Sequence, residues 1–76
     1  MELKEKTKKV VREIFEMYAD SNGIEVGLAK TIGVFQEAID AKKNNNFMSE
    51  EKKQTMIKKL ELKIEYAKKL AQGGPF

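Results

Sequence analysis

The sequence predicts an all-α protein, an antiparallel three-helix bundle with helices at about residues 2–19, 23–43 and 49–72. Three observations lead to this prediction: apolar residues recur at helical spacing in three long segments, two polar stretches separate them, and capping residues stand near their ends. Connections this short fold neighbouring helices back antiparallel. The 76 residues have room for one small core. We expect residues 1–72 to form a single domain and residues 73–76 a short Gly/Pro tail.

The first predicted helix is amphipathic. Its apolar residues fall on one side, at spacings typical of a helix: Leu3, Val10, Ile14, Met17 and Tyr18, with Thr7 and Val11 beside them. Charged residues lie away from that side. Oppositely charged pairs four residues apart, such as Arg12 with Glu16, are expected to stabilise the exposed side. The pattern predicts a helix that buries one side in the bundle.

The second predicted helix follows the turn-prone residues 20–23. Asn22, with Glu25 three positions later, is typical of a capping box, in which the two side chains satisfy free amides. The main apolar side comprises Ile24, Leu28, Ile32, Phe35 and Ile39, and Val34, Ala38 and Ala41 broaden it. So broad an apolar side indicates that this helix packs against both other helices, so we expect it to be the central helix of the bundle. Gly27 and Gly33 have two interpretations, local tolerance of glycine or a close approach between helices.

The third predicted helix follows three successive asparagines, which favour turns over continued helix. Ser49 is a suitable N-cap, and Glu50 and Glu51 place negative charge in the first turn, where it suits the helix dipole. The main apolar side comprises Met56, Ile57, Leu60, Ile64, Ala67 and Ala71. We expect Gly73 to adopt a left-handed conformation after the last turn, and Pro75 to prevent the helix from resuming.

Leu62 and Tyr66 do not belong to that apolar side, because they lie at least about 100° from its centre at 3.6 residues per turn. One interpretation is that isolated apolar residues are normal on a surface. The other is a second apolar side, to which Leu70 and Phe76 contribute, that contacts another chain. A core this small yields marginal stability, which self-association would increase. We therefore predict partner binding through Leu62, Tyr66, Leu70 and Phe76, with a homodimer favoured over other assemblies.

Positive charge is concentrated in the last third of the chain. The formal net charge is +3, and residues 44–76 account for all of it, with seven lysines and four glutamates. Lys52, Lys59, Lys63 and Lys69 are the candidates for contacts with an anion or a nucleic acid. The other interpretation is a solvated helix surface, since the chain has a single arginine and base-specific recognition relies heavily on that residue. Nucleic-acid binding is thus an alternative function.

Composition excludes most chemistry. Cysteine and histidine are both absent, so the chain has no disulfide, no thiolate nucleophile and no imidazole base, and no glycine-rich phosphate loop occurs. We expect no enzymatic activity, no cofactor and no metal site. The first residues lack the apolar core of a signal peptide, and no run is long enough to span a membrane, so a cytoplasmic protein is expected. The sequence predicts a small non-catalytic protein-binding or regulatory protein, acting through an exposed apolar face of its last helix.

Residues 32–60 resemble a hairpin of the class IIa bacteriocin immunity proteins. The resemblance rests on the apolar stretch 32–39, the asparagine loop, Ser49, and the lysine-bearing segment 56–60. Members of that family are basic antiparallel helical bundles in the cytosol. The resemblance implies an immunity function, as a second alternative. The resemblance implies that the last helix and the tail bind a complex of membrane receptor and bacteriocin, here through Leu62, Tyr66 and residues 73–76.

Overall fold

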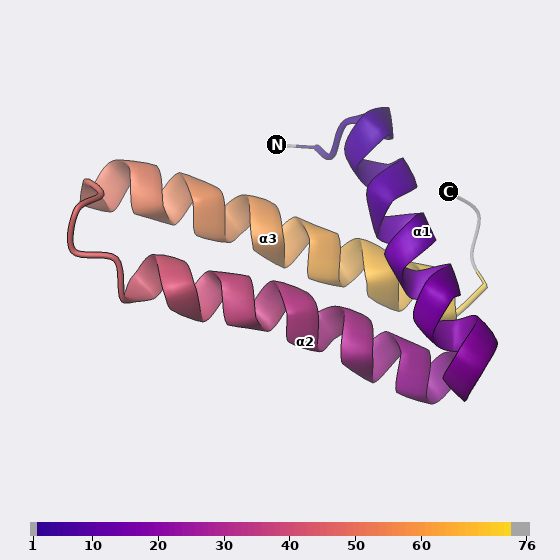
Figure 1. The fold of residues 1–76 in the computed structure, drawn as a ribbon. Coiled ribbons are helices and arrows are strands. Elements are labelled where there is room, and N and C mark those ends of the chain that lie inside the picture. The colour runs from indigo at the N-terminus through magenta and orange to yellow at the C-terminus, as the bar shows by residue number, and fades with distance from the viewer. Residues whose placement is uncertain (1, 74–76) are drawn as a thin grey trace.

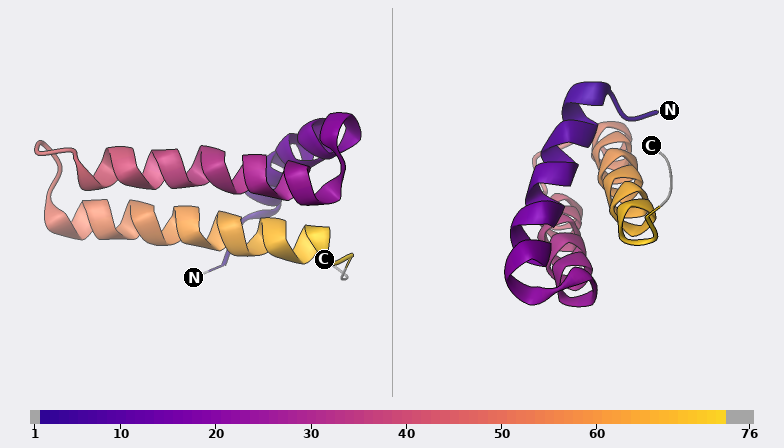
Figure 2. Two further views of the ribbon diagram at one scale, coloured as in Figure 1. Left: turned by 90° about the horizontal axis from the view of Figure 1, so that it is seen from below. Right: turned by 90° about the vertical axis from the view of Figure 1, so that its right-hand side faces the viewer.

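A computed structural model describes residues 2–73 and contains three helices, α1 (Glu5–Asn22), α2 (Ile24–Lys43) and α3 (Glu50–Ala71) (Figure 1). The prediction of an all-α three-helix bundle is confirmed. α2 and α3 lie side by side as an antiparallel hairpin, and α1 crosses one end of that hairpin (Figure 2). α2 packs extensively against both other helices, whereas α1 and α3 share a smaller contact. None of the described helices combines the length and the apolar composition needed to cross a membrane.

The connection between α1 and α2 is tighter than predicted. α1 begins at Glu5 and continues to Asn22, so only Gly23, with φ 88° and ψ 165°, interrupts the helical backbone. The predicted capping box is wrong. The side chain of Asn22 donates a hydrogen bond back to the carbonyl oxygen of Tyr18, at 3.0 Å, and no side chain caps α2. Glycine fits this position because its φ lies in the left-handed region.

The ends of α3 follow the signals in the sequence. Ser49 is the N-cap, and its hydroxyl oxygen accepts a hydrogen bond from the Lys52 amide at 3.2 Å. The helix ends at Ala71, and Gly73 follows with φ 73°, its amide donating to the Leu70 carbonyl at 3.1 Å. Both predicted caps are therefore confirmed. The predicted role of Pro75 falls outside the described residues.

Side chains from all three helices meet in the core. Val11 of α1, Phe35 of α2, and Tyr66 and Ala67 of α3 form the central buried cluster. Six partly buried residues pack against it: Leu3, Ile14, Leu28, Leu60, Ile64 and Leu70. Phe15, Ile39 and Ile57 are buried as well.

Four large residues that periodicity placed on the apolar sides are exposed instead. Val10 and Met17 are 48% and 58% exposed, and Ile24 and Val34 are 58% and 39% exposed. In α1 the buried side is centred on Val11 and Phe15, about 100° around the helix from Val10. Because α1 crosses the hairpin at one end, only part of the apolar surface of α1 is covered, and Val10 and Met17 remain exposed.

The two glycines of α2 differ in their surroundings. A Cβ atom at Gly27 would lie 2.7 Å from the Cα and N atoms of Ala19, so the backbones of α1 and α2 approach closely there. Beside it the buried Thr31 hydroxyl donates to the Gly27 carbonyl at 2.7 Å. A Cβ atom at Gly33 would meet nothing within 4 Å. Close approach is thus confirmed for Gly27 and wrong for Gly33.

The molecule is elongated. It measures 38 × 23 × 16 Å, and its radius of gyration is 13.1 Å, against about 11 Å expected for a compact chain of this length. The long dimension is that of the α2–α3 hairpin, and α1 lies at the end formed by the start of α2 and the end of α3. The opposite end of the hairpin therefore has no third helix upon it.

Candidate functional site

The second apolar side of α3 faces α1. Tyr66 is only 6% exposed and belongs to the central cluster with Val11, Phe35 and Ala67. The prediction that Tyr66 lies on an exposed face is therefore wrong. α3 has apolar residues on two sides, as the sequence indicated, but both of these sides pack within the same chain. The first packs on α2, and the second is covered where α1 crosses α3.

Two cations of α1 surround the Tyr66 side chain. Arg12 Nη1 donates a hydrogen bond to the Tyr66 hydroxyl oxygen at 2.8 Å, and Lys8 Nζ lies 5.8 Å from the centre of the ring. A buried tyrosine hydroxyl needs such a partner, and an ammonium over a ring face is attracted to it. The single arginine of the chain therefore joins α1 to α3, and the expected pairing of Arg12 with Glu16 is not observed.

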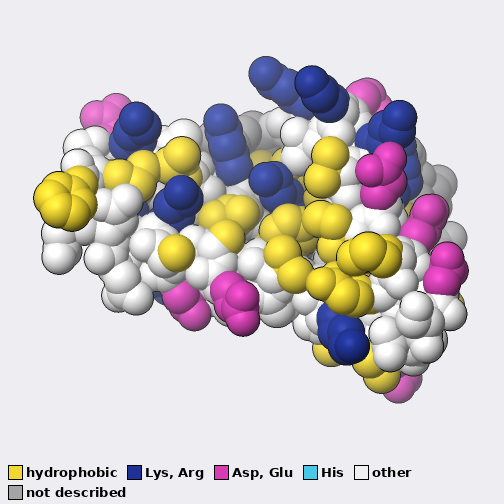
Figure 3. Space-filling model, viewed as in Figure 1, with side chains coloured by type: hydrophobic (Ala, Val, Ile, Leu, Met, Phe, Trp, Pro, Cys, Tyr) yellow, Lys and Arg dark blue, Asp and Glu magenta, His cyan; other side chains and the backbone are white. Residues whose placement is uncertain are grey.

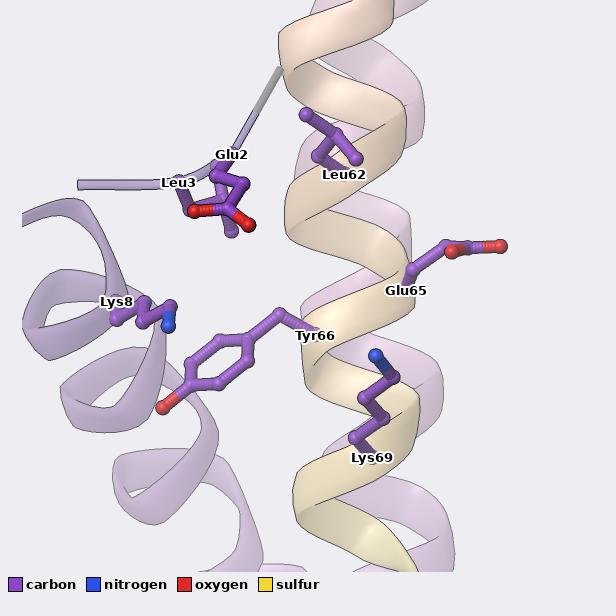
Figure 4. A pocket seen from close by; sticks show the side chains of 7 residues that line it. All are labelled: Glu2, Leu3, Lys8, Leu62, Glu65, Tyr66 and Lys69. Atoms are coloured by element: carbon purple, nitrogen blue, oxygen red, sulfur yellow. The ribbon is translucent and has the colours of Figure 1, made fainter. Parts of the chain in front are cut away.

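The other predicted partner-binding residues are divided by the fold. Leu70 is half-buried and packs against the core. Leu62 is half-buried and, with Tyr66, lines a hollow of about 290 Å³ between the N-terminal segment and α3. Figure 4 shows Tyr66 projecting towards α1 below Leu62, with Glu65 directed away. Phe76 lies outside the described residues. Leu62, Tyr66 and Leu70 therefore do not form one exposed apolar face.

Three of the four predicted lysines share one side of α3. Lys52, Lys59 and Lys63 recur at intervals of seven and four residues, which places them in line along the helix. Lys52 and Lys59 are exposed, whereas Lys63 is half-buried, with its Nζ 5.9 Å from the centre of the Phe35 ring. Lys69 lies on a different side, against the hollow that contains Tyr66 (Figure 4).

An exposed apolar surface does exist, but it belongs mainly to α1 and α2. Large hydrophobic side chains at least 39% exposed occur at six positions: Val10, Met17, Ile24, Val26, Val34 and Phe47. Figure 3 shows hydrophobic side chains gathered beside α1, with lysine or arginine side chains among them and acidic side chains towards the margins of the view. Periodicity alone missed this surface, since it placed Val10, Met17, Ile24 and Val34 on the apolar sides. Val10 lies only about 40° around the helix from the half-buried Ile14, so periodicity contains no signal that separates the two.

Val10, one of these exposed residues, lines a groove of about 230 Å³. The groove is also lined by Lys6, Thr7 and Val11 of α1, by Phe35 of α2 and by Lys63 of α3. We refer to these six residues as the α1–α3 groove. A second hollow of about 210 Å³ adjoins it, because Thr7 and Lys63 line both. The arrangement offers an apolar floor beside fixed positive charge, which suits binding rather than bond chemistry.

Comparisons with protein-family models, with curated proteins and with solved structures find no significant match. The likeness of residues 32–60 to the bacteriocin immunity proteins therefore stays a prediction, and the functional argument rests on the surface itself.

Proposed function

We propose that this chain is a small non-catalytic protein-binding or regulatory protein. The observations that carry the proposal are the exposed hydrophobic side chains of α1 and α2, among them Val10, Met17 and Val34, and the gathering of hydrophobic side chains on the face shown in Figure 3. Contiguous apolar surface rimmed by polar residues marks interaction sites in small proteins. The sequence predicted an exposed apolar face on α3 instead, but Tyr66 of that face is buried in the core. The mechanism remains recognition between helix faces, with lysines steering the encounter.

Site-specific photo-crosslinking in living cells tests this proposal. A photoreactive phenylalanine analogue is placed at Met17 or at Val34, and at the exposed polar position Gln54 of α3 as the control. We expect defined protein adducts from Met17 and Val34 and none of the same mass from Gln54. Identical adducts at all three positions, or none at the two apolar ones, would contradict the proposal.

A homodimer is the simplest form of such binding and the one that the sequence favours. The homodimer is supported by the small size of the core, because burying the exposed apolar groups against a second copy would add stability. Sedimentation velocity at micromolar concentration measures it directly. A dimer that dissociates when Val34 is changed to glutamate is expected. A monomer at every concentration would remove the homodimer and leave a different protein as the partner.

Nucleic-acid binding is a second candidate, favoured by the alignment of Lys52, Lys59 and Lys63 on one side of α3. Neutralising phosphates releases counterions, so the affinity would fall steeply as salt increases. A labelled DNA duplex at ~50 mM salt should then bind, and Lys59→Gln should weaken it while Lys58→Gln, on another side of α3, does not. Absence of binding under that condition would eliminate this candidate.

A further inference from the structure

The α1–α3 groove combines an apolar floor with a positively charged border. Val11 is fully buried and Phe35 is 6% exposed, so they form the floor, while Val10 remains 48% exposed on the wall. Lys63 lies over the floor, its Nζ 5.9 Å from the centre of the Phe35 ring. An apolar group entering the groove therefore meets carbon surface below and an ammonium group beside it.

The charge around the groove is strongly unbalanced. Lys6 and Lys63 line the groove, and the adjoining hollow adds Lys4 and Lys59. The same two cavities contain one carboxylate, that of Glu2. The two ion pairs among the described residues join Lys8 to Glu5 and Lys53 to Glu50, so neither of them uses any of these four lysines. The surface is therefore complementary to an anionic partner that also carries apolar groups.

The shape of the surface selects among anionic partners. The hollow that adjoins the groove is lined by Lys59, and α1 covers the hairpin at one end only, so a rod-like ligand has room to continue along α3 past Lys59 towards Lys52. All elements of the described chain are helices, so no sheet edge is present to which an extended peptide would add as a strand. An acidic amphipathic helix is such a rod-like ligand, and its apolar side chains recur once per helix turn, so they form a row that a groove can bind.

We infer that the α1–α3 groove binds an acidic amphipathic helix of a different protein. Apolar side chains of that helix sit over Phe35 against Val10, and carboxylates on its flanks pair with Lys59 and Lys63. A second copy of the chain fits less well. If the same surface of two copies came together, lysines would face lysines, and bringing like charges together costs free energy. The inference rests on the proposed function and adds to it the position of the site and the chemistry of the partner.

Three fluorescent peptides of equal length test the inference by anisotropy with the full chain. The first is an amphipathic helix with leucines on one side and glutamates beside them. The second has lysine in place of each glutamate, and the third has the composition of the first in scrambled order. We expect the first alone to bind, with an affinity that decreases as salt increases. Equal binding of the first and second peptides, or of the first and third, would overturn the inference.

Matched variants locate the binding. Val10→Glu places a charge on the groove wall, whereas Gln54→Glu places the same charge at an exposed position of α3 that does not line the groove. Lys59→Glu reverses a charge at the border, and Lys58→Glu reverses the neighbouring one on another side of α3. We expect Val10→Glu and Lys59→Glu to weaken binding of the first peptide about tenfold, and their controls to leave it unchanged.

The outcomes separate this inference from the proposed function. Circular dichroism of each variant verifies that the bundle still folds. A homodimer that Val10→Glu dissociates would place a second copy in the groove and overturn the inference while protein binding stands. Binding of a DNA duplex that depends on Lys59, with no binding of the first peptide, would overturn it as well. Failure of the crosslinking at Met17 and Val34 would instead count against protein binding as a whole.

Discussion

Replacing Gly27 by alanine adds one methyl group at the point where α2 lies against the end of α1. The added Cβ would lie 2.7 Å from the Cα and N atoms of Ala19 and 2.9 Å from its Cβ. Carbon atoms in contact are normally about 3.5–4.0 Å apart, so the two helices would have to separate by about 1 Å. Two of the three atoms are backbone, and no rotation of a flexible side chain relieves the clash.

Gly33→Ala is the matched control, since both glycines lie inside α2 and neither has a positive φ. Alanine is favoured over glycine within a helix by about 1 kcal/mol, and this gain applies to both variants. Overpacking costs typically about 1–3 kcal/mol and applies to Gly27→Ala alone, because a Cβ at Gly33 meets nothing within 4 Å. We therefore expect Gly33→Ala to be more stable than the parent chain, and Gly27→Ala to fall about 1–3 kcal/mol below Gly33→Ala.

Thermal unfolding followed by circular dichroism at the helical band measures the difference. For a domain of this size, 1 kcal/mol corresponds to a shift of about 4–8 °C in Tm. Gly33→Ala should raise Tm by about that amount, and Gly27→Ala should unfold at least about 4 °C below Gly33→Ala. Equal midpoints for the two variants would refute the reasoning, since they would mean that α1 and α2 accommodate the methyl group without cost.

Three further substitutions test other contacts by urea unfolding. Tyr66→Phe removes the acceptor of the Arg12 hydrogen bond and should lower the free energy of unfolding by about 1–2 kcal/mol; an unchanged midpoint would show that the bond contributes nothing. Ser49→Ala removes the oxygen that accepts from the Lys52 amide and should cost about 1 kcal/mol, a loss that Ser49→Asp should avoid. Val11→Ala leaves a cavity at a fully buried position and should cost about 2 kcal/mol; a much smaller loss would place Val11 outside the core.

The candidate site was predictable only in part. The lysines at positions 52, 59 and 63 were identified from the sequence, and the structure places them along one side of α3. The exposure of the apolar residues was predicted wrongly, since Tyr66 is in the core and Val10 is exposed. Periodicity ranks residues around a helix axis, but it contains no information about where along that axis a neighbour crosses. A helix that crosses at one end covers only some members of a correctly identified apolar side.

The sequence by itself determined the three helices, the cap at Ser49, the left-handed Gly73 and the two apolar sides of α3, because these depend on neighbours within a few residues along the chain. Only the tertiary structure decided that α1 covers the second side of α3, that Gly27 touches Ala19 while Gly33 faces open space, and that Val10 stays exposed beside Lys63. Each of these depends on the crossing of α1 over the hairpin. That crossing is set by the packing of side chains distant in sequence, among them Arg12 against Tyr66.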